Sequence, residues 1–335
     1  MTPRFDFASD TCAPAAPEVI AAIARANQGY VSSYGEDEWT ARAADLIRAV
    51  LDADADVRFV PSATAANAVC VAALCRPFEA VLAHREAHIL THEAGAPAMF
   101  GHGVGLIGLP GETGKIDMAA FERALAAPDV SYMQSPAALS VTTPTEYGGV
   151  YSNSAIASLC AKAKSRGLGV HVDGARLANA IAAGFDPKQL KKYTDMLVFG
   201  GAKSGMTGTE AIVIFDKSLS RRFDARLKQV GQLPAKGRFY AAPFIGMLEE
   251  GALFRYATHA NDMAAKLAAA SPFEKRHPVE SNAVFLEIPG EALEHLQAKG
   301  WLVYPFEDGS VRFTTCWCTS AEAVEELSAD LASLT

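Results

Sequence analysis

Short apolar runs rich in β-branched and aromatic residues alternate along the chain with longer segments of helical periodicity. This alternation is typical of a mainly parallel sheet wrapped by helices. The last predicted strand of the series follows its predecessor after a short turn, which suits an antiparallel pair. The strands are predicted at residues 57–60, 104–109, 130–133, 169–173, 196–199 and 211–215.

Helical patterns join these strands and then give way to a different arrangement near the C-terminus. Helices are predicted over residues 62–75, 153–166 and 238–270. After Ser271 and Pro272 the pattern becomes strand, helix, strand and helix, at residues 283–288, 291–299, 311–315 and 321–334. We therefore expect a large α/β domain over residues 1–250, including an N-terminal arm, and a small α+β domain over residues 251–335.

Composition and charge exclude several classes of protein. Half of the 335 residues are hydrophobic and one-fifth are charged, so a packed core is expected and wholesale disorder is excluded. Thirty basic against 38 acidic side chains give a net charge of −8, which argues against nucleic-acid binding. No apolar run approaches the roughly 18 residues of a membrane span, so no membrane association is expected. The first residues lack an apolar segment, and no secretory signal is expected.

The cysteines indicate reduced thiols in a cytoplasmic protein. They form no C-x-x-C pair, and no histidine lies beside them at zinc-binding spacing. Cys316 and Cys318 are the only close pair, and on a strand both would face the same side. The other four are Cys12, Cys70, Cys75 and Cys160.

Two glycine motifs resemble nucleotide-binding sequences but lie in the wrong context. Residues 103–108 match G-x-G-x-x-G, on which a nicotinamide oxidoreductase would rely, but that motif must join a strand to a helix. Here Pro110 follows, and the motif itself lies in a predicted strand. Residues 111–115 resemble part of a phosphate-binding loop, with Ile116 where that loop has Ser or Thr. Neither segment is expected to bind a nucleotide.

Three other features lie at predicted strand ends. The turn 61–64 opens a helix with small and hydroxyl residues, whose free amide groups attract an anion, unless Ser62 is simply a helix cap. Asp173 is either a helix cap or a buried anion awaiting a cation such as a ring nitrogen. Lys203 lies among small residues, so a planar group can approach its amine, unless it is an ordinary surface lysine. Burial would lower its pKa toward the free amine that attacks carbonyls.

Together these three features describe a site for pyridoxal 5′-phosphate. The helix N-terminus binds the phosphate, and the carboxylate of Asp173 keeps the ring nitrogen protonated. Lys203 forms the Schiff base that tethers the cofactor.

The chain resembles the low-specificity L-threonine aldolase family, within the fold-type-I pyridoxal phosphate enzymes. The most specific part of the resemblance is His171–Arg176 followed by Gly201–Lys203, and it extends over nearly the whole chain. The other matching segments are Ser9–Thr11, Tyr34–Gly35, Pro61–Asn67, His88, Glu93–Gly95, Thr145–Glu146 and Val311–Phe313. The resemblance implies an aspartate aminotransferase-like fold with a pyridoxal phosphate-binding large domain. It also implies a homotetramer, built as a dimer of dimers.

The resemblance implies a role for each residue of the cofactor site. Lys203 bonds the cofactor covalently and Asp173 pairs with its pyridine nitrogen. The phosphate is held by Ala63 and Thr64, with Ser62 beside them. The family usually has Gly where Ala63 stands, so the backbone approach is tighter here.

It also implies how the substrate is bound. Ser9, Arg176 and Arg312 surround the substrate carboxylate, and Arg176 also lies at the cofactor. His88 stacks on the cofactor ring and assists proton transfer. Tyr34 enters the active site of the partner subunit.

The implied reaction is cleavage of L-threonine, L-allo-threonine or a related β-hydroxy-α-amino acid such as phenylserine to glycine and an aldehyde. A base must remove the β-hydroxyl proton. His88 is the first candidate, with a purely stacking ring as the alternative. Relatives often have a second active-site histidine near residues 125–140, but this chain has none between His102 and His171. The sequence therefore does not identify the residue that acts as this base.

Other readings of the same residues remain. Lys203 and Asp173 would equally serve a β-eliminating lyase or an aminotransferase, which differ in the substrate bond that they break. If residues 84–92 are helical, His84, His88 and His92 share one face, but no carboxylate partner other than Glu93 is evident and no metal site is expected.

Overall fold

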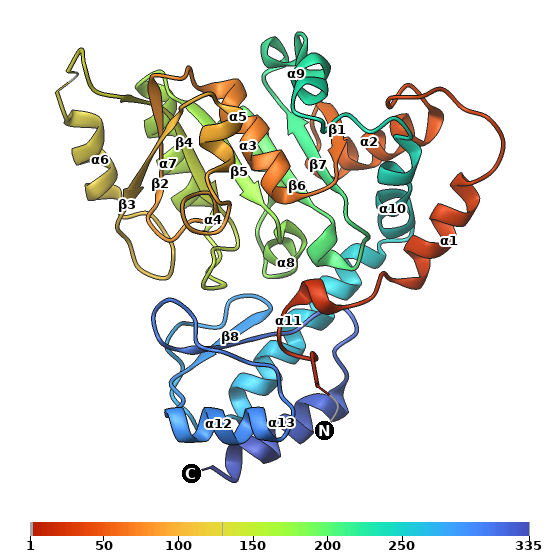
Figure 1. Cartoon of the computed structure of the whole chain (residues 1–335), viewed down its shortest axis with the longest axis vertical. Helices are drawn as coiled ribbons and strands as arrows, with labels where there is room; N and C mark the ends of the chain where they lie inside the picture. The colour runs from red at the N-terminus through yellow and green to blue at the C-terminus, as the bar shows by residue number, and fades with distance from the viewer. Residues whose placement is uncertain (1–2, 129, 335) are drawn as a thin grey trace.

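A computed structural model describes residues 3–128 and 130–334 of the chain. Its centre is a seven-stranded sheet with the strand order β1-β7-β6-β5-β4-β2-β3 (Figure 1). Five neighbouring strands, β6, β5, β4, β2 and β3, run parallel. Strand β7 runs antiparallel to both of its neighbours, β6 and β1. The strands are β1 Asp56–Val60, β2 Glu79–His84, β3 Gly105–Leu109, β4 Ser135–Thr142, β5 Gly169–Gly174, β6 Met196–Gly200 and β7 Glu210–Ile214.

Helices cover both faces of this sheet. They are α1 Pro17–Ala26, α2 Glu38–Leu51, α3 Ala63–Leu74, α4 His88–Thr91, α5 Ala96–Phe100, α6 Met118–Ala126, α7 Asn153–Ser165, α8 Leu177–Ala182, α9 Phe223–Gln229 and α10 Arg238–Leu248, with short 3-10 turns at Asp10–Cys12, Pro187–Lys192, Ala202–Ser204 and Lys217–Ser220. Leu197 and Phe199 of β6 share a core with α2, α7 and α10. Met196 and Val198 point to the opposite face and share a core with α3 and α9. All five residues of β6 are buried, as expected for an inner strand covered on both sides.

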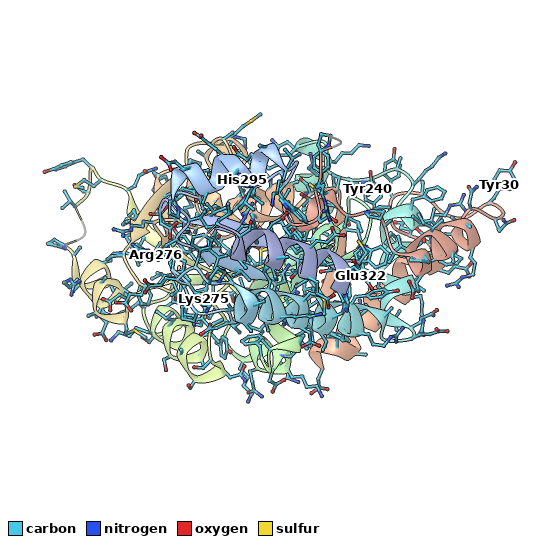
Figure 2. The ribbon with its side chains drawn as sticks, turned by 90° about the horizontal axis from the view of Figure 1, so that it is seen from below. Tyr30, Tyr240, Lys275, Arg276, His295 and Glu322 are labelled. Carbon is cyan, nitrogen blue, oxygen red and sulfur yellow. The ribbon has the colours of Figure 1, made fainter. Side chains whose placement is uncertain are left out.

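The C-terminal part of the chain forms a second, smaller sheet. The sheet consists of strands β8 Ala283–Leu286 and β9 Val311–Thr314, which pair antiparallel. The helices of this part are α11 Ala252–Ala270, α12 Gly290–Ala298 and α13 Ala321–Ala332. Its core includes Trp301 and Phe313, together with Phe7 from the N-terminal segment. Both termini lie at this unit (Figure 1), and Figure 2 shows it from below, with His295 of α12 and Glu322 of α13 labelled.

Helix α11 connects the two cores. Leu253 and Ala257 in its first turns belong to the core of the large sheet, whereas Ala264 and Leu267 belong to the core of the small one. The predicted domain boundary near residue 250 stays a prediction, and the chain turns between α10 and α11 at Gly251, whose φ is +67°. Among the described residues, none of the helices has both the length and the hydrophobicity to cross a membrane.

Most predicted elements are confirmed, but the strand predicted at residues 130–133 is wrong. This segment is a turn in which the Met133 amide donates to the Val130 carbonyl at 2.9 Å, and Tyr132 is 89% exposed. The strand lies further along, at Ser135–Thr142, where it is hydrogen-bonded to β2 and β5. Its small residues make a weak sequence signal, because its burial comes from its neighbours rather than from its own hydrophobicity.

Three smaller differences concern the remaining pattern. The helical stretch 238–270 is two helices rather than one. Strand β2 was not predicted, although five of its six residues are buried. Cys316 and Cys318 lie in the turn after β9 rather than on a strand, and their sulfur atoms are 3.5 Å apart.

Candidate active site

The C-terminal ends of neighbouring parallel strands bring the predicted site residues together. Asp173 near the end of β5 pairs in register with Thr142 of β4 and Val198 of β6. The turn that carries Lys203 follows directly after β6, and helix α3 packs against β5, β6 and β7. This edge of an open α/β sheet is the usual place for a ligand.

The carboxylate of Asp173 is buried and held from two sides. Its Oδ1 accepts a hydrogen bond from the Ala175 amide at 2.9 Å, and its Oδ2 accepts one from the Asn67 side chain at 2.9 Å. Asp173 therefore caps the following turn and is also a buried carboxylate, whereas the cation that it would pair with stays a prediction. Each oxygen retains a lone pair for a cation.

A hydrogen-bonded chain links Asp173 to His88. Asn67, fully buried in α3, also donates to Glu93 Oε1 at 2.8 Å, and the same oxygen lies 2.9 Å from His88 Nδ1. Burial raises the pKa of Glu93, and the hydrogen bonds from His88 and Asn67 oppose this only in part. The contact with Glu93 engages Nδ1 of the His88 ring and leaves its Nε2 atom available.

Lys203 lies in the turn Ala202–Ser204, flanked by glycines. Gly205 has a φ of +82°, and a Cβ atom there would lie 2.9 Å from the ring of Trp317. A Cβ atom on Gly201 would lie 2.4 Å from the Thr209 carbonyl oxygen. Burial, reinforced by the positive charge of Arg176, lowers the pKa of Lys203 toward the free amine.

Glu210 is hydrogen-bonded to the backbone just before the turn that carries Lys203. Its Oε2 accepts a hydrogen bond from the Gly201 amide at 2.6 Å, two residues before Lys203. Burial raises the pKa of Glu210 to about 8, although this hydrogen bond and the charge of Lys203 act in the opposite direction. Glu210 is therefore a positioning residue for the turn rather than a permanent negative charge.

Two arginines and one carboxylate form the next part of the site. Asp10 binds Arg176 through two hydrogen bonds, at 2.6 and 2.9 Å, and Ser9 Oγ lies 3.4 Å from Asp10 Oδ1. Burial, followed by repulsion from Arg176, lowers the pKa of Arg312. Its Nε atom is buried and has no hydrogen-bond partner among the described residues. Two cations thus face one resident anion, which suits a second carboxylate.

The predicted anion site lies at the N-terminus of α3. Ser62 is its N-cap, and its Oγ accepts a hydrogen bond from the Ala65 amide at 3.2 Å. The cap interpretation of Ser62 is therefore confirmed. The amides of Ala63 and Thr64 lie in the first turn, where a helix offers no internal acceptor.

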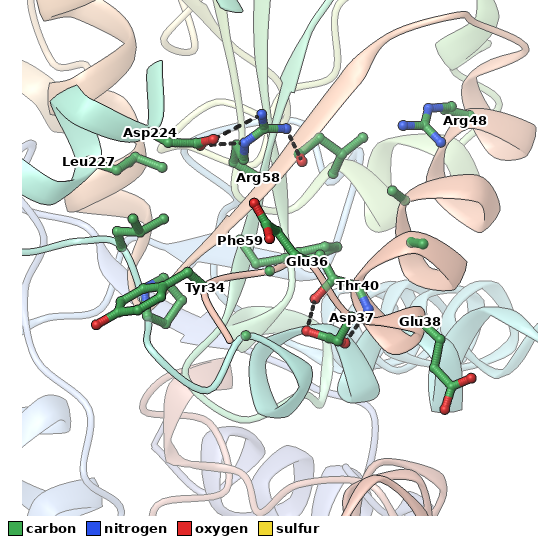
Figure 3. A pocket seen from close by; sticks show the side chains of 17 residues that line it. Tyr34, Glu36, Asp37, Glu38, Thr40, Arg48, Arg58, Phe59, Asp224 and Leu227 are labelled. Carbon is green, nitrogen blue, oxygen red and sulfur yellow. Dashed lines mark hydrogen bonds and ion pairs between the residues drawn. The ribbon is translucent and has the colours of Figure 1, made fainter. Parts of the chain in front are cut away.

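Tyr34 does not lie with Lys203 in the same chain. It lines a separate cavity of about 500 Å³ with Phe59, Asp37 and Gly237 (Figure 3). The Lys228 amine lies 4.4 Å from the centre of its ring. The role of Tyr34 in a partner subunit stays a prediction.

Residues 84–92 are not one helix, so the condition under which the three histidines would share a face is not met. His84 ends β2 and lies 3.2 Å from the Gly111 carbonyl oxygen, whereas His88 begins the four-residue helix α4. His92 pairs instead with Glu307 at 2.9 Å. Among the described residues, no group of three or more His, Cys, Asp or Glu side chains is arranged to hold a metal ion.

Sequence reasoning assigned no role to five residues that build this site. Asn67 had a signal, since it is a polar residue in an otherwise apolar helix. Asp10, Glu93 and Glu146 lay in matching segments but were given no function. Glu210 is the polar residue directly before the apolar run of β7, and its role depends on contacts that only the fold creates.

Comparisons with known proteins agree with this geometry. A sequence model of the beta-eliminating lyase family matches residues 6–289. Low specificity L-threonine aldolases from Pseudomonas aeruginosa and another Pseudomonas are each 42% identical over 97% of this chain and 96% of theirs. A probable low-specificity L-threonine aldolase from Schizosaccharomyces pombe is 27% identical over 85% of this chain and 76% of its own.

Solved structures show the same relationship. The threonine aldolase of Leishmania major superposes with a TM-score of 0.92 at 30% identity, over 97% of this chain and 98% of its own. A probable N-succinyldiaminopimelate aminotransferase from Thermus thermophilus shares the fold at 15% identity, with a TM-score of 0.73 over 98% and 93% of the two chains. The fold is therefore that of the fold-type-I pyridoxal phosphate enzymes, and the chain belongs to the beta-eliminating lyase family and, within it, to the low-specificity L-threonine aldolases.

Proposed function

We propose that this protein is a pyridoxal 5′-phosphate-dependent aldolase that cleaves β-hydroxy-α-amino acids to glycine and an aldehyde. L-Threonine, L-allo-threonine and phenylserine are the proposed substrates. The observation that carries the proposal is Lys203, which is half-buried in the turn after β6 and interacts electrostatically with the buried carboxylate of Asp173 on β5. The 42% identity to aldolases named for L-threonine supports the substrate class.

The residues present fit the cofactor. The site combines an amine with a lowered pKa, a buried carboxylate with free lone pairs, and free amides at the start of α3. His171 lies on the same face of β5 as Asp173, and burial lowers its pKa to about 4. It is therefore neutral and does not compete with the ring nitrogen for the carboxylate. His88 is oriented by Glu93 to cover the ring.

Each residue has a task in the proposed reaction. When bound, pyridoxal phosphate supplies an electron sink for the electron pair left on Cα. Lys203 provides the amine that bonds the cofactor. Asp173 holds the proton on the ring nitrogen. Ala63 and Thr64 donate their amides to the phosphate.

Arg312 and Arg176 select and orient the amino-acid carboxylate. A guanidinium can bind a carboxylate through two parallel hydrogen bonds, which fixes direction as well as position. Arg176 already gives its Nε and Nη2 atoms to Asp10, so Arg312 is the main anchor. Because the carboxylate and the amino group of the substrate are both fixed, the direction of the Cα–Cβ bond decides which bond to Cα breaks.

The products of the reaction test this proposal. The purified protein, supplied with pyridoxal phosphate and L-threonine, should release acetaldehyde and glycine in equal amounts. Ammonia or a keto acid would instead indicate a β-eliminating lyase or an aminotransferase. Reduction of a nicotinamide cofactor would support the oxidoreductase alternative, which the strand conformation of residues 105–109 disfavours.

A homo-oligomer, with a tetramer as the expected form, is part of the same proposal. Tyr30 is fully exposed and projects at one end of the molecule (Figure 2), and Ile20 and Tyr34 are 55% and 46% exposed. Such apolar exposure on α1 and the following loop suits a subunit contact. Light scattering of the purified protein tests the oligomeric state, and a monomer would contradict the proposed oligomer.

A cytoplasmic location is also proposed, from cysteine usage, and cell fractionation tests this location.

A further inference from the structure

The loop after β4 presents a carboxylate to the site from the side opposite Lys203's strand. The Thr143 amide donates to the Asp173 carbonyl at 3.0 Å, so the loop starts against the strand that carries the cofactor-binding carboxylate. Thr145 holds the loop further along, since its hydroxyl donates to the Thr113 carbonyl at 2.6 Å and accepts from the Gly149 amide at 3.0 Å. Glu146 follows Thr145 directly and lies in the turn that Thr145 closes with Gly149, so its backbone position is fixed by the fold.

Only one of the two carboxylate oxygens of Glu146 is used. Oε1 accepts a hydrogen bond from the His88 amide at 2.8 Å, the first amide of α4. Oε2 is buried and has no hydrogen-bond partner among the described residues, although part of the Glu146 residue remains exposed. A buried, unpaired carboxylate oxygen is costly, so its retention calls for a partner that arrives with a ligand.

The charged and titratable groups around Glu146 define its surroundings. They are His88 from α4, Asp173 from β5, Arg176 before α8, and Tyr147 and Tyr151 from its own loop. Burial, reinforced by the negative charge of Asp173, raises the pKa of Glu146 to about 7, while the His88 amide opposes the shift. A carboxyl group in this range can both take and give a proton near neutral pH.

We propose that Glu146 is the catalytic base that takes the proton from the β-hydroxyl group of the substrate. This inference rests on the proposed aldolase function, and it fills a role for which no histidine exists between His102 and His171. Oε2 accepts the hydroxyl proton, and the electron pair of the O–H bond becomes the second bond of the aldehyde carbonyl. The Cα–Cβ bond breaks, and its electron pair stays with the glycine half. Cα then gains one proton and Glu146 gives one up, so the reaction needs no further reactant.

The test uses a variant that separates basicity from hydrogen bonding. In Glu146→Gln the amide oxygen can still accept from the His88 amide, but no oxygen can take a proton. Glu112→Gln is the matched control, because Glu112 is an exposed carboxylate in the adjacent loop. Both proteins are compared with the wild type after saturation with pyridoxal phosphate.

Turnover gives the first readout. Glu146→Gln should bind the cofactor and glycine as the wild type does, but release aldehyde from L-threonine about 10² to 10⁴-fold more slowly, the usual contribution of a general base. The wild-type kcat/KM should fall as the pH drops below about 7, and this limb should be absent from Glu146→Gln. A rate within threefold of the wild type, or an unchanged acidic limb, would overturn the proposal.

The pH dependence of stability gives a second readout that needs no turnover. A carboxyl whose pKa is raised by folding binds more protons in the folded state, so stability falls as the pH rises. Relative to Glu146→Gln, the wild type should therefore lose unfolding free energy between about pH 5 and pH 8, whereas Glu112→Gln should follow the wild type. Parallel curves for the wild type and Glu146→Gln would contradict the proposal. If the wild type itself releases no aldehyde, the proposed function fails, whatever Glu146→Gln does.

Discussion

Asp10 and Arg176 are 166 positions apart in the sequence, yet Asp10 accepts hydrogen bonds from Arg176 Nε at 2.6 Å and Nη2 at 2.9 Å. This ion pair ties the N-terminal segment to the loop after β5, and the Asp10 side chain is fully buried in it. In the proposed function the two arginines have different roles, because Arg176 is bound to Asp10 whereas the Nε atom of Arg312 has no partner among the described residues.

Removing Asp10 should destabilise the protein strongly. Burial opposes ionisation of Asp10, but the charge and hydrogen bonds of Arg176 prevail and lower its pKa. Because Asp10→Ala leaves Arg176 buried and unpaired, the free energy of unfolding should fall by about 3 to 5 kcal/mol. Urea denaturation measures this loss. Asp54→Asn, at an exposed pair with Lys217, is the control and should show no measurable change.

The Asp10 contribution also has a defined pH dependence. A carboxyl with a lowered pKa stabilises the folded state above its ordinary value of 3.8, and that stability is lost as the pH falls through the lower, folded value. Asp10→Asn should therefore approach the wild type in stability only at strongly acidic pH. An equal difference at pH 3 and pH 7 would contradict the assigned pairing.

Arg312 should matter for substrate and not for cofactor. Arg312→Ala should keep the absorbance of the bound cofactor but lose about 2 to 5 kcal/mol of transition-state binding for L-threonine, as truncation of buried charge pairs does. Steady-state kinetics measure this as a fall in kcat/KM of about 30-fold or more. Arg276→Ala, whose side chain is 52% exposed and pairs with Glu287, is the control. Unchanged kinetics in Arg312→Ala would remove it from the substrate site.

Asn67 should be required for the hydrogen-bonded chain from His88 to Asp173. Asn67→Leu, similar in size, removes one hydrogen-bond donor from Glu93 and one from Asp173, and each lost partner costs about 1 to 3 kcal/mol. We expect lower stability and weaker cofactor binding, both measurable by thermal unfolding with and without pyridoxal phosphate. A variant that matches the wild type in both would show that the chain has no role in holding Asp173.

The sequence was sufficient for the parts of the site that local patterns encode. Lys203 among small residues and Asp173 after an apolar run predict the cofactor chemistry, and β5 and β6 lie where the hydrophobic runs predict them. The strand at Ser135–Thr142 was not predicted because Ala137, Ala138 and Ser140 have low β-strand propensity. Tyr132 and Met133 have a higher propensity but are exposed in a turn, and the strand was wrongly predicted there.

Contacts between distant segments could not be predicted. The Asp10–Arg176 pair and the Asn67–Asp173 hydrogen bond join residues 166 and 106 positions apart, and no local pattern specifies either. The unpaired oxygen of Glu146 has the same origin, since its burial depends on how the loop after β4 meets α4.

Glu210 should make stability fall with rising pH. Its pKa is raised to about 8 by burial, so the folded protein binds a proton that the unfolded chain releases above about pH 4.5. Between these values the wild type should lose on the order of a few kcal/mol relative to Glu210→Gln, which can still accept from the Gly201 amide. Unfolding at pH 5, 7 and 9 measures the difference. A constant difference across this range would show that Glu210 does not titrate in the folded state.

The covalent partner of the cofactor is the most direct test of the central claim. Borohydride reduction of the protein with bound pyridoxal phosphate fixes the cofactor on the amine that holds it, and peptide mass spectrometry identifies that residue. The mass of the reduced cofactor should lie on the peptide that contains Lys203, and Lys203→Ala should carry none. Attachment to another lysine, or no attachment in the wild type, would contradict the claim that Lys203 is the cofactor-binding amine.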